Sequence, residues 1–561
     1  MILLLLQVLA TGGQSGATDS LAVVKSARRA QDVFEFTRRA SLPERRGGWS
    51  GPCRVPIGRM CYWYDGRVDS APPEPPRARL ARARLLAELD SAAAMLPGDG
   101  WIAGQRVRYL LEDGQPQAAS RAVEQCRATR WWCEALDGLV RHVSGDFAGA
   151  DSTFTAARGA MPDDERCRWS DISSLLAGEL AKRYHQLDCA GRAALAARWW
   201  WLAQPLWSLP GNDRRTEHFA RVTMAQIEQG RRSVFGIAWA DDLREGLVRY
   251  GWPTFWTREP QDPLLLSSEP RITGHEPSPA FDFAPQARAL DHPERAQPED
   301  WTVDPPQAPE RYAPAYATAF TNLDHQLAVF RRDDSCVVAA AYDLSRDTLF
   351  AGQPVAAALA LAVDEHTTAL VRDSGLAAGT RALAANAPCG PVVVSLEAMA
   401  AAVRHAARAR YGLDLAPHTG GKVAVSDLLL FDPPDSLPES LAAALPHALA
   451  SPRIVSDKKL GVYWELYGVD PAHGAVAVSL TMSRQGTGWL RRAAQALRLA
   501  GRHHDVRLQW EEVPETPLVT PRALAIDLAG LSPGRYLIEV SITPPGDETV
   551  TTRRTVIIAR R

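Results

Sequence analysis

The 34-residue stretch 131–164 decides the fold of the first half of the chain and reads Trp131-Trp-Cys-Glu-Ala-Leu-Asp-Gly-Leu-Val-Arg-His-Val-Ser-Gly-Asp-Phe-Ala-Gly-Ala-Asp-Ser-Thr-Phe-Thr-Ala-Ala-Arg-Gly-Ala-Met-Pro-Asp-Asp164. Apolar residues fall at helical spacing on both sides of a turn at Gly145, and Pro162 ends the second helix. Gly138 leaves room for close packing of the two helices, and Phe154 provides an aromatic side chain for the next one. A single helical hairpin cannot bury its apolar face alone, so we expect this one to stack on neighbouring hairpins.

The same stretch resembles one tetratricopeptide repeat, in which a small residue, aromatic residues and a final proline occupy fixed places. The matching residues are Gly138, Gly145, Phe147, Ala150, Phe154, Ala157 and Pro162. An upstream unit aligns more loosely, through Gly114, Ala119, Val123 and Cys126. Helical patterns continue over 172–184 and 190–202, so we expect a short, degenerate tetratricopeptide-like domain over residues 79–205.

The first residues predict export. The apolar run Met1–Ala10 and the small residues Ser15-Gly-Ala17 fit a signal peptide over 1–17, although no Lys or Arg precedes the run. The alternative is a buried N-terminal helix. Residues 18–78 follow as an N-terminal helix, with helical spacing over 19–39, and a Cys-containing loop. We expect a periplasmic or secreted protein with no transmembrane segment in the mature chain, because no later apolar stretch is long enough.

Length and charge narrow the class of protein. A chain of 561 residues is too long for one hydrophobic core, so we expect two to four domains. The 63 basic and 65 acidic residues leave a net charge of -2, which provides no field that attracts phosphate backbones. We therefore expect no nucleic-acid partner.

The eight cysteines suit an oxidising compartment because their number is even. Cys53 and Cys61 are close enough in sequence to close a loop, and Cys126 and Cys133 lie across a boundary between a helix and a turn. These two pairs are our disulfide candidates, with buried free thiols as the alternative. No C-x2-4-C pair is present, so we expect no metal site.

Residues 200–260 carry the densest signature in the chain. Its parts are Trp200-Trp-Leu-Ala-Gln-Pro-Leu206, Pro210-Gly-Asn-Asp-Arg-Arg-Thr-Glu-His218 and Trp239-Ala-Asp-Asp-Leu-Arg-Glu-Gly-Leu-Val-Arg-Tyr-Gly-Trp-Pro253. Together they resemble the GWxTD domain family of exported bacterial proteins. In that family a W-x-D-P element, an Asn/Glu/Arg helix and a G-W-x-T-D…Y-G-x-P element recur in this order.

The match to this family is partial. Gly236 stands three residues before Trp239 instead of beside it. Ala240 replaces the Thr, and Gln204 stands where an Asp is usual. The resemblance implies a GWxTD-like region over 206–257 in an exported bacterial protein, and it implies no particular chemistry.

The charged residues of this region allow two interpretations. If they converge they form an acid–base site or an anion-binding cleft, and otherwise they form a network that fixes helix and turn geometry. The residues concerned are Asp213, Glu217, His218, Asp241, Asp242, Arg244 and Glu245. As binding candidates we take Asn212, Glu217, Asp241, Arg244 and Tyr250. We assign no catalytic residue and no cofactor, because none of the G-x-S-x-G, H-E-x-x-H and phosphate-loop motifs is present.

A stripe of tryptophans precedes and enters this region. They either fill gaps between stacked helices or line an aromatic groove for a peptide or glycan, and core packing is the commoner outcome. The tryptophans are Trp131, Trp132, Trp199, Trp200, Trp201 and Trp207.

The second half of the chain is β-rich. Prolines recur over 258–315, which predicts an extended connector that lies on its neighbours. Strand-like runs bounded by turn residues predict a β-rich domain over 316–440. The turn Leu531-Ser-Pro-Gly-Arg-Tyr536, which leads into an alternating strand, resembles Ig-like sandwich domains and predicts one over 450–561. A helical insert is expected at 489–500.

The sequence therefore predicts an α+β multidomain protein, with tetratricopeptide-like helical repeats followed by an Ig-like β-sandwich. Our leading hypothesis is a non-catalytic scaffold or binding protein of the bacterial cell envelope, with a protein partner, because helical repeats present surfaces and sandwiches present loops and edges. The alternative is an exported hydrolase or small-ligand binder that uses the Asp/Glu/Arg/His cluster at 212–245.

Overall fold

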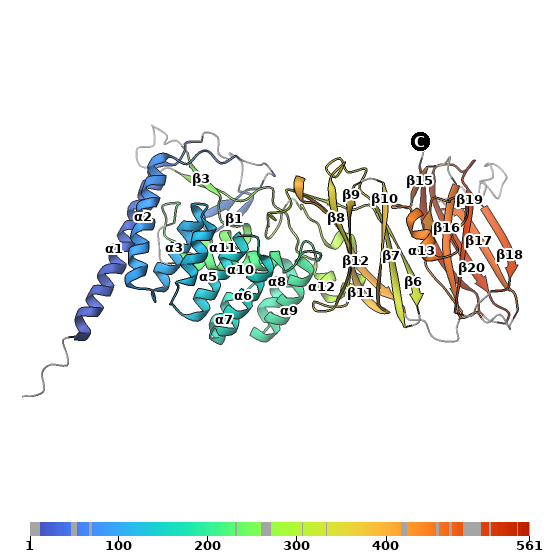
Figure 1. The fold of residues 1–561 in the computed structure, drawn as a ribbon, viewed down its shortest axis with the longest axis horizontal. Coiled ribbons are helices and arrows are strands. Elements are labelled where there is room, and N and C mark those ends of the chain that lie inside the picture. The colour runs from blue at the N-terminus through green and yellow to red at the C-terminus, as the bar shows by residue number, and fades with distance from the viewer. Residues whose placement is uncertain are drawn as a thin grey trace, which may run out of the picture. The chain divides into compact units, whose positions relative to one another are not determined.

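The chain is an α+β protein in which a helical region precedes a set of β-sheets (Figure 1). A computed structural model describes residues 12–45, 53–64, 66, 70–229, 233–259, 271–305, 307–332, 334–377, 379–416, 423–455, 459–469, 474–485, 506–514, 518–546 and 548–559. Residues 1–11 of the predicted signal peptide and the predicted helix 489–500 lie outside these ranges. The chain divides into two compact units, a helical unit (Met1–Ala287 and Trp301–Thr318) and a β unit (Arg288–Asp300 and Ala319–Arg561).

The helical unit contains eleven α-helices in its described residues, and the hairpin predicted from 131–164 is present as α5 and α6. The helices are α1 (Gly12–Ser41), α2 (Pro76–Met95), α3 (Gly100–Glu112), α4 (Pro116–Glu124), α5 (Arg130–Val143), α6 (Phe147–Ala160), α7 (Asp163–Trp169), α8 (Gly178–Gln186), α9 (Cys189–Ala203), α10 (Asp213–Ile227) and α11 (Asp241–Tyr250). No helix in the described ranges combines the length and the apolarity needed to cross a membrane.

Two short hairpins accompany these helices, β1 (Val55–Ile57) with β2 (Met60–Tyr62) and β3 (Phe255–Arg258) with β4 (Ile272–His275). Aspartates cap several helix starts by accepting a backbone hydrogen bond three residues on. Asp99 caps α3, Asp146 caps α6 and Asp188 caps α9, with oxygen–nitrogen distances of 2.8–2.9 Å. Each cap satisfies one of the free N–H groups in the first turn, so the helix boundaries follow from local sequence.

Two glycines let neighbouring helices approach closely. A Cβ atom on Gly138 of α5 would lie 2.6 Å from the Phe154 ring of α6, and one on Gly104 of α3 would lie 3.1 Å from the Trp132 ring of α5. The two contacts differ, because Gly138 meets the second helix of its own hairpin and Gly104 meets the first helix of the next hairpin.

Helix α10 packs across α3, α5 and α6 and is almost wholly buried. Its Phe219 ring stacks on Trp169 with ring centroids 4.8 Å apart and contacts Phe154 at 5.7 Å. We call the surface of α3, α5 and α6 that α10 covers the array face. Because α10 lies on it, the array face is not open to solvent.

The first part of the β unit is a pair of sheets that enclose a hydrophobic core. One sheet has the strand order β5-β12-β11-β8-β9 and the other β10-β7-β6. The strands are β5 (Ala319–Asn322), β6 (His325–Arg332), β7 (Ser335–Asp343), β8 (Pro354–Ala362), β9 (Thr368–Leu376), β10 (Thr380–Pro388), β11 (Gly390–Ala400) and β12 (His405–Leu415).

The second part of the β unit is another pair of sheets with its own core. One sheet contains β13-β16-β14 with β19 beside β16, and the other has the order β15-β21-β20-β17-β18. The strands are β13 (Ala424–Val425), β14 (Leu429–Phe431), β15 (Arg453–Val455), β16 (Lys459–Tyr467), β17 (Val476–Arg484), β18 (Val506–Glu512), β19 (Val519–Asp527), β20 (Gly534–Thr543) and β21 (Val550–Ala559). The short helix α13 (Leu441–Ala444) precedes β15.

The division of the β half that we predicted at residue 440 is wrong. Strands β13 and β14 precede that position but pair with β16, so they belong to the second pair of sheets. The sequence shows where these strands are, but the residues of β16 with which they pair lie 30 to 43 positions further on.

Strands β7 and β16 are buried on both faces. Alternate residues of β7 face the first core, and the residues between them, Val337, Ala339 and Ala341, face a further core. Tyr463 of β16 reaches the same further core from the second pair of sheets. The two pairs of sheets are thus joined by an apolar interface to which β6, β7, β14, β16 and α13 contribute, and four sheets stack in series within the β unit (Figure 1).

The proline-rich stretch 258–315 differs from the extended connector that we predicted. It contains β4, the short helix α12 (Ala287–Asp291) and two 3-10 turns at Pro293–Arg295 and Pro298–Asp300. A proline is tolerated in the first turn of a helix, where its missing N–H has no partner to lose, so prolines start these turns instead of preventing them.

We predict that Gly138→Ala destabilises the protein by about 1–3 kcal/mol, because the added methyl group has no space beside Phe154. The matched control is Gly159→Ala in α6, where a Cβ atom meets nothing within 4 Å. This change should be neutral or slightly stabilising, because alanine favours helix over glycine. Denaturant unfolding of both variants tests the contrast, and equal stabilities would contradict the close packing of α5 on α6.

Candidate functional site

The five binding candidates lie on or beside two helices of the helical unit. Asn212 immediately precedes α10 and Glu217 lies within it, whereas Asp241, Arg244 and Tyr250 belong to α11. The side chains of Asn212, Glu217 and Tyr250 each form a hydrogen bond to another part of the helical unit. Asp241 and Arg244 are exposed. The structure thus separates the candidates into three that join elements of the fold and two that solvent can reach.

Asn212 is the N-cap of α10. Its Oδ1 accepts a hydrogen bond from the backbone N–H of Arg215 at 2.9 Å, and its Nδ2 donates to the carbonyl of Trp200 in α9 at 2.8 Å. One side chain therefore starts α10 and attaches it to the end of α9.

Glu217 lies between His142 of α5 and Arg221 of its own helix. Its carboxylate oxygens are 2.6 Å from His142 Nε2 and 2.5 Å from Arg221 Nε. Burial alone would raise the pKa of the Glu217 carboxyl. The positive charge of Arg221 and the contacts with His142 outweigh burial and hold this pKa well below its usual range. The side chain is ionised and fully engaged, so it serves as a link between α5 and α10.

Thr216, His142 and Glu217 stand in the order of a hydroxyl–histidine–carboxylate triad. The Thr216 Oγ1 is 2.9 Å from His142 Nδ1, the nitrogen opposite Glu217. A nucleophile has to reach a substrate carbonyl, but Thr216 is 0% exposed and its hydroxyl donates to the Asp213 carbonyl at 3.1 Å. This arrangement is a buried hydrogen-bond network and not an acyl-transfer site.

Arg221 extends the network to the end of α11 and to the proline-rich stretch. Its guanidinium donates to the carbonyls of Val248, Arg249 and Arg311 at 3.1, 3.0 and 2.8 Å. Carbonyls at the end of a helix have no partner within the helix, so a buried arginine there stabilises the helix terminus. Glu217 holds Arg221 in this position.

Tyr250 is buried at the end of α11. Its ring stacks on Tyr62 of the β1–β2 hairpin with the ring planes 6° apart, and its hydroxyl donates to the Ala308 carbonyl at 3.2 Å. Burial raises the pKa of Tyr250 to about 12. The phenol is therefore neutral at physiological pH and acts as a packing and hydrogen-bonding group.

Arg214 and Glu310 form an ion pair that the sequence analysis did not single out. Both side chains are 0% exposed, with Nη2 2.5 Å from Oε2 and Nε 3.2 Å from Oε1. Two tryptophan rings surround the guanidinium, Trp199 at 5.9 Å and Trp200 at 5.4 Å. Only the presence of charged residues in an otherwise apolar region could have pointed to this pair, because Glu310 lies in the proline-rich stretch predicted as a connector.

A second buried network lies at the other end of α10, and it was also missed. Glu228, just after α10, is 2.5 Å from Arg108 Nη1 of α3, and Arg108 also pairs with Glu112 at 2.8 Å. Glu112 in turn pairs with Arg38 of α1 at 2.8 Å. Burial raises the pKa of Glu228 to about 7 in spite of Arg108. Charged contacts therefore fix both ends of α10.

Asp241 and Arg244 lie in the first turns of α11 beside the β1–β2 hairpin. Arg59 attaches the hairpin to α11 by donating two hydrogen bonds to the Asp242 carboxylate, from Nε at 2.6 Å and from Nη2 at 2.7 Å. The hydrogen bonds from Arg59 lower the pKa of Asp242 to about 2. Asp241 and Arg244 are thus exposed next to the point where the β1–β2 hairpin contacts α11.

Four disulfides are formed in the structure, two of them the pairs that the spacing predicted. These are Cys53–Cys61, which closes the β1–β2 hairpin, and Cys126–Cys133, which joins the end of α4 to α5. The other two are Cys167–Cys189 and Cys336–Cys389. Four disulfides indicate an oxidising compartment, extracellular or periplasmic.

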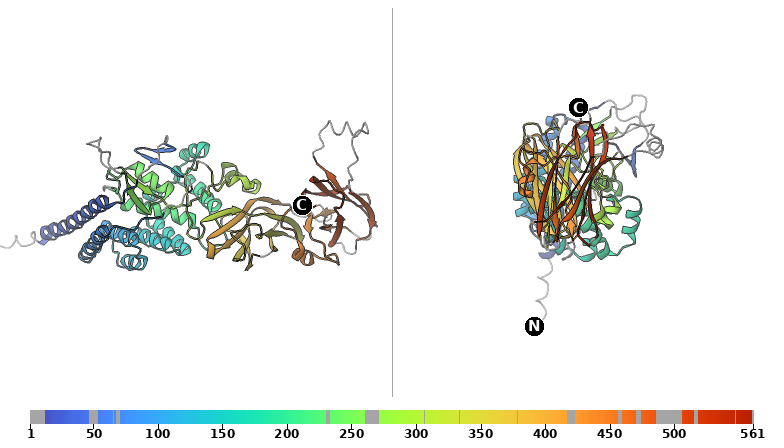
Figure 2. Two further views of the ribbon diagram at one scale, coloured as in Figure 1. Left: turned by 90° about the horizontal axis from the view of Figure 1, so that it is seen from above. Right: turned by 90° about the vertical axis from the view of Figure 1, so that its right-hand side faces the viewer.

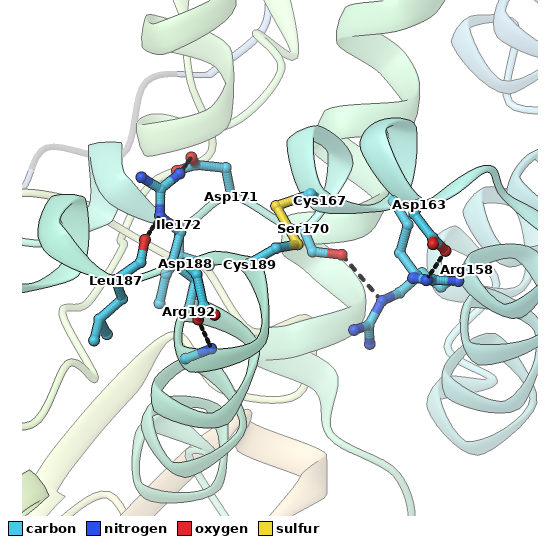
Figure 3. Close-up of a disulfide and its surroundings, with 12 residues drawn as sticks. Arg158, Asp163, Cys167, Ser170, Asp171, Ile172, Leu187, Asp188, Cys189 and Arg192 are labelled. Carbon is cyan, nitrogen blue, oxygen red and sulfur yellow. Dashed lines mark hydrogen bonds and ion pairs between the residues drawn. A yellow bond between two sulfur atoms is a disulfide. The ribbon is translucent and has the colours of Figure 1, made fainter.

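Cys167–Cys189 links α7 to the start of α9 (Figure 3). Polar contacts surround it: Arg158 Nε donates to Ser170 Oγ at 3.1 Å, and Asp188 caps α9. Figure 3 shows these contacts on both sides of the disulfide, which ties together two helices whose cysteines are 22 residues apart in sequence.

Five of the six tryptophans in the predicted stripe are buried, namely Trp132, Trp199, Trp200, Trp201 and Trp207. They fill the space between helices, as core packing requires. Two surface hollows of about 420 and 390 Å³ are lined by other residues and include none of the five binding candidates. Among the described residues, no three His, Cys, Asp or Glu side chains are grouped so that they can hold a metal ion.

No family model matches the chain, and no curated protein matches it. A transglutaminase structure from red sea bream has 11% identity over 42% of this chain and 32% of that one, with a TM-score of 0.14. A Bacteroides uniformis β-glucuronidase 2 bound to cyclophellitol-6-carboxylate aziridine, and another β-glucuronidase from that organism, have 7% and 8% identity. Each is matched over 40% of this chain and 26% of its own, with a TM-score of 0.15. The chain spans about a third or less of these proteins, and similarities this weak carry no argument about its function.

We predict that Arg214 and Glu310 are strongly coupled in stability. Arg214→Met or Glu310→Leu alone should cost about 3–5 kcal/mol, because each leaves one buried charge unpaired. The double variant should be more stable than either single variant. A double-mutant cycle by denaturant unfolding measures this, and additive losses would contradict the pairing. The exposed pair Glu179 and Lys182 is the control and should show no measurable coupling.

We predict that Asp213→Asn changes the pH dependence of stability. Burial raises the pKa of Asp213 from 3.8 to about 6, although hydrogen bonds from Tyr316 and Tyr312 act to lower it. The folded state therefore binds the proton more tightly than the unfolded state. As pH rises from about 4 to about 6, the free energy of unfolding of the wild type should therefore fall by about 2–3 kcal/mol relative to that of Asp213→Asn.

Unfolding measured across this pH range tests the shift at Asp213. The exposed Asp32→Asn is the matched control and should follow the wild type at every pH. If the free energy of unfolding of the wild type and that of Asp213→Asn changed in parallel with pH, Asp213 would have an ordinary pKa. That result would contradict its burial in the folded protein.

Proposed function

We propose that this chain is an exported, non-catalytic protein of the bacterial cell envelope that binds a protein partner. The observation that carries the proposal is that the buried charged residues of 212–228 bind other parts of the helical unit. Glu217, Arg221 and Arg214 each form ion pairs or hydrogen bonds with other parts of the chain. A catalytic or ligand-binding cluster needs such groups free to meet a substrate.

The GWxTD-like resemblance supports this proposal, because the motif residues have physical reasons to be where they are. Gly251 of the Y-G-x-P element has a φ of +99°, and a Cβ atom there would lie 3.3 Å from Arg221 Nη2. Asn212 caps α10 and Tyr250 packs on Tyr62. We infer that the shared motif encodes a structural module whose core is α10.

We further propose that α3–α4 and α5–α6 are degenerate tetratricopeptide-like repeats and that both pairs of sheets are Ig-like sandwiches. Gly114 and Gly145, which have φ of +68° and +82° and each join the two helices of one hairpin, support the first, and two sheets around each core support the second. In this protein α10 covers the array face, so a partner has to bind elsewhere.

Asp241 and Arg244 are the best candidates for contact with that partner. They are the two binding candidates that solvent reaches, and Arg59 and the Cys53–Cys61 disulfide hold the adjacent hairpin in place. A charged pair on a rigid turn gives specificity to a protein interface without a large cost in lost flexibility.

A small anionic ligand is the alternative, and one observation favours it. Among the described residues, Asp213 Oδ1, Arg214 Nη1 and both ring nitrogens of His218 are buried without a hydrogen-bond partner. Buried polar atoms usually have partners, so a bound molecule or water between them would satisfy these groups. Their exposures of 1% or less favour water over a substrate.

The test is crosslinking of the tagged full-length protein in its own cells, followed by mass spectrometry of the captured proteins. We expect an envelope protein to be captured by the wild type and lost, or reduced at least about fivefold, with Asp241→Ala/Arg244→Ala. The control Asp164→Ala/Arg168→Ala also removes one exposed acidic and one exposed basic side chain from the helical unit and should capture the partner normally.

Two outcomes would contradict the proposal. Absence of any reproducible partner would remove the binding function. Equal capture by both double variants would keep the binding function but exclude the α11 turn as its surface.

A further inference from the structure

Helix α1 presents a stripe of apolar and basic side chains to solvent. Leu21, Val33 and Phe36 are 70%, 59% and 65% exposed, and Lys25 and Arg29 are exposed between them. These positions follow one another at steps of four, four, four and three residues, so they lie on one face of the helix. We call this stripe the α1 outer face.

The α1 outer face lies at the end of the helical array. Helix α1 packs on α2, with Ser26 Oγ 2.6 Å from Glu88 Oε1, and α2 packs on α3. Figures 1 and 2 show α1 outermost in this series. The outer face of a terminal helix is normally polar, because nothing in the array covers it. Three large exposed apolar side chains there indicate that something outside the helical unit covers them.

The charge of this end of the array indicates what covers it. Among the described side chains of α1 and α2, the exposed basic ones are Lys25, Arg28, Arg29, Arg77, Arg79 and Arg84. The exposed acidic ones are Asp32 and Asp90, and Asp90 is paired with Arg106 at 2.5 Å. The whole chain has a net charge of only -2, so this concentration of positive charge is local. It complements a negatively charged surface.

We propose that the α1 outer face binds the surface of an anionic lipid membrane. Helices that lie in a membrane interface combine large apolar side chains, which enter the acyl boundary, with Lys and Arg, which meet anionic headgroups. The sequence that precedes α1 contains the apolar run Met1–Ala10, so export brings α1 to a membrane. This attachment is independent of the partner proposed for Asp241 and Arg244.

The test is co-sedimentation of the full-length protein with vesicles of phosphatidylglycerol and phosphatidylcholine in equal parts, and with vesicles of phosphatidylcholine alone. We expect binding to the anionic vesicles only, weakened by added salt. Lys25→Glu/Arg29→Glu should bind at least about tenfold more weakly, and Phe36→Ser should also bind more weakly. The control Arg507→Glu/Arg535→Glu makes the same charge change at exposed positions of the β unit and should bind like the wild type.

Three results would overturn this proposal. Equal binding to both kinds of vesicle would assign attachment to uncharged apolar residues. Equal binding by the two double variants would show that the location of the positive charge does not matter. Self-association that Phe36→Ser abolishes, without vesicle binding, would assign the α1 outer face to a second copy of the chain.

Discussion

The pairing of charges buried around α10 is the constraint on which the helical unit depends. Removing an ion from water costs several kcal/mol even after relaxation, and the cost is recovered only if the partner sits in good geometry. Arg214 and Glu310 meet this condition with no exposed surface, and Arg108 and Glu228 meet it at the other end of the helix. The positions of α3, α10 and the stretch around residue 310 are therefore fixed relative to one another, because moving any of them would leave a buried charge unpaired.

This constraint also decides what the helical unit can offer to other molecules. A stack of helical hairpins usually binds ligands on the face that its inner helices share, but here α10 lies on the array face. Two of the residues that the sequence suggested as a site, Asn212 and Glu217, hold α10 in place there. We therefore propose that function lies elsewhere on the unit, at the first turns of α11 that carry Asp241 and Arg244 and at the α1 outer face.

The β unit reaches rigidity by a different route. Its two pairs of sheets share an apolar interface in which alanines of β7 lie against the second pair of sheets. Polar contacts reinforce it: Arg332 pairs with the buried Glu465, and Asp427 Oδ2 accepts from the Val329 N–H at 3.0 Å. This interface is buried and apolar like a hydrophobic core, so we regard the two pairs of sheets as one rigid body within the β unit.

Local patterns could be predicted from the sequence, and distant pairings could not. The α5–α6 hairpin and the disulfides Cys53–Cys61 and Cys126–Cys133 depend on residues within a few turns of each other. The sequence of strand β12 does not indicate a strand, because His405-Ala-Ala-Arg-Ala-Arg410 is rich in alanine and arginine, which favour helix, and its neighbours in the sheet make it a strand.

The buried ion pairs were missed for a related reason. Glu310 looks like any charged residue of a proline-rich stretch, and its partner is 96 positions away. Nothing in the spacing of the two residues indicates that they meet, and only the folded chain shows it.

Hydrogen exchange of the native protein, followed by mass spectrometry of peptides that cover Asp213–Ile227, tests the central claim most directly. If α10 is the structural centre of the helical unit, its amides exchange only when the whole unit unfolds and are among the slowest in residues 76–250. A binding element or lid would open locally instead, as mobile functional segments do. Exchange of α10 as fast as that of exposed turns, with α3 and α5 still protected, would contradict the account.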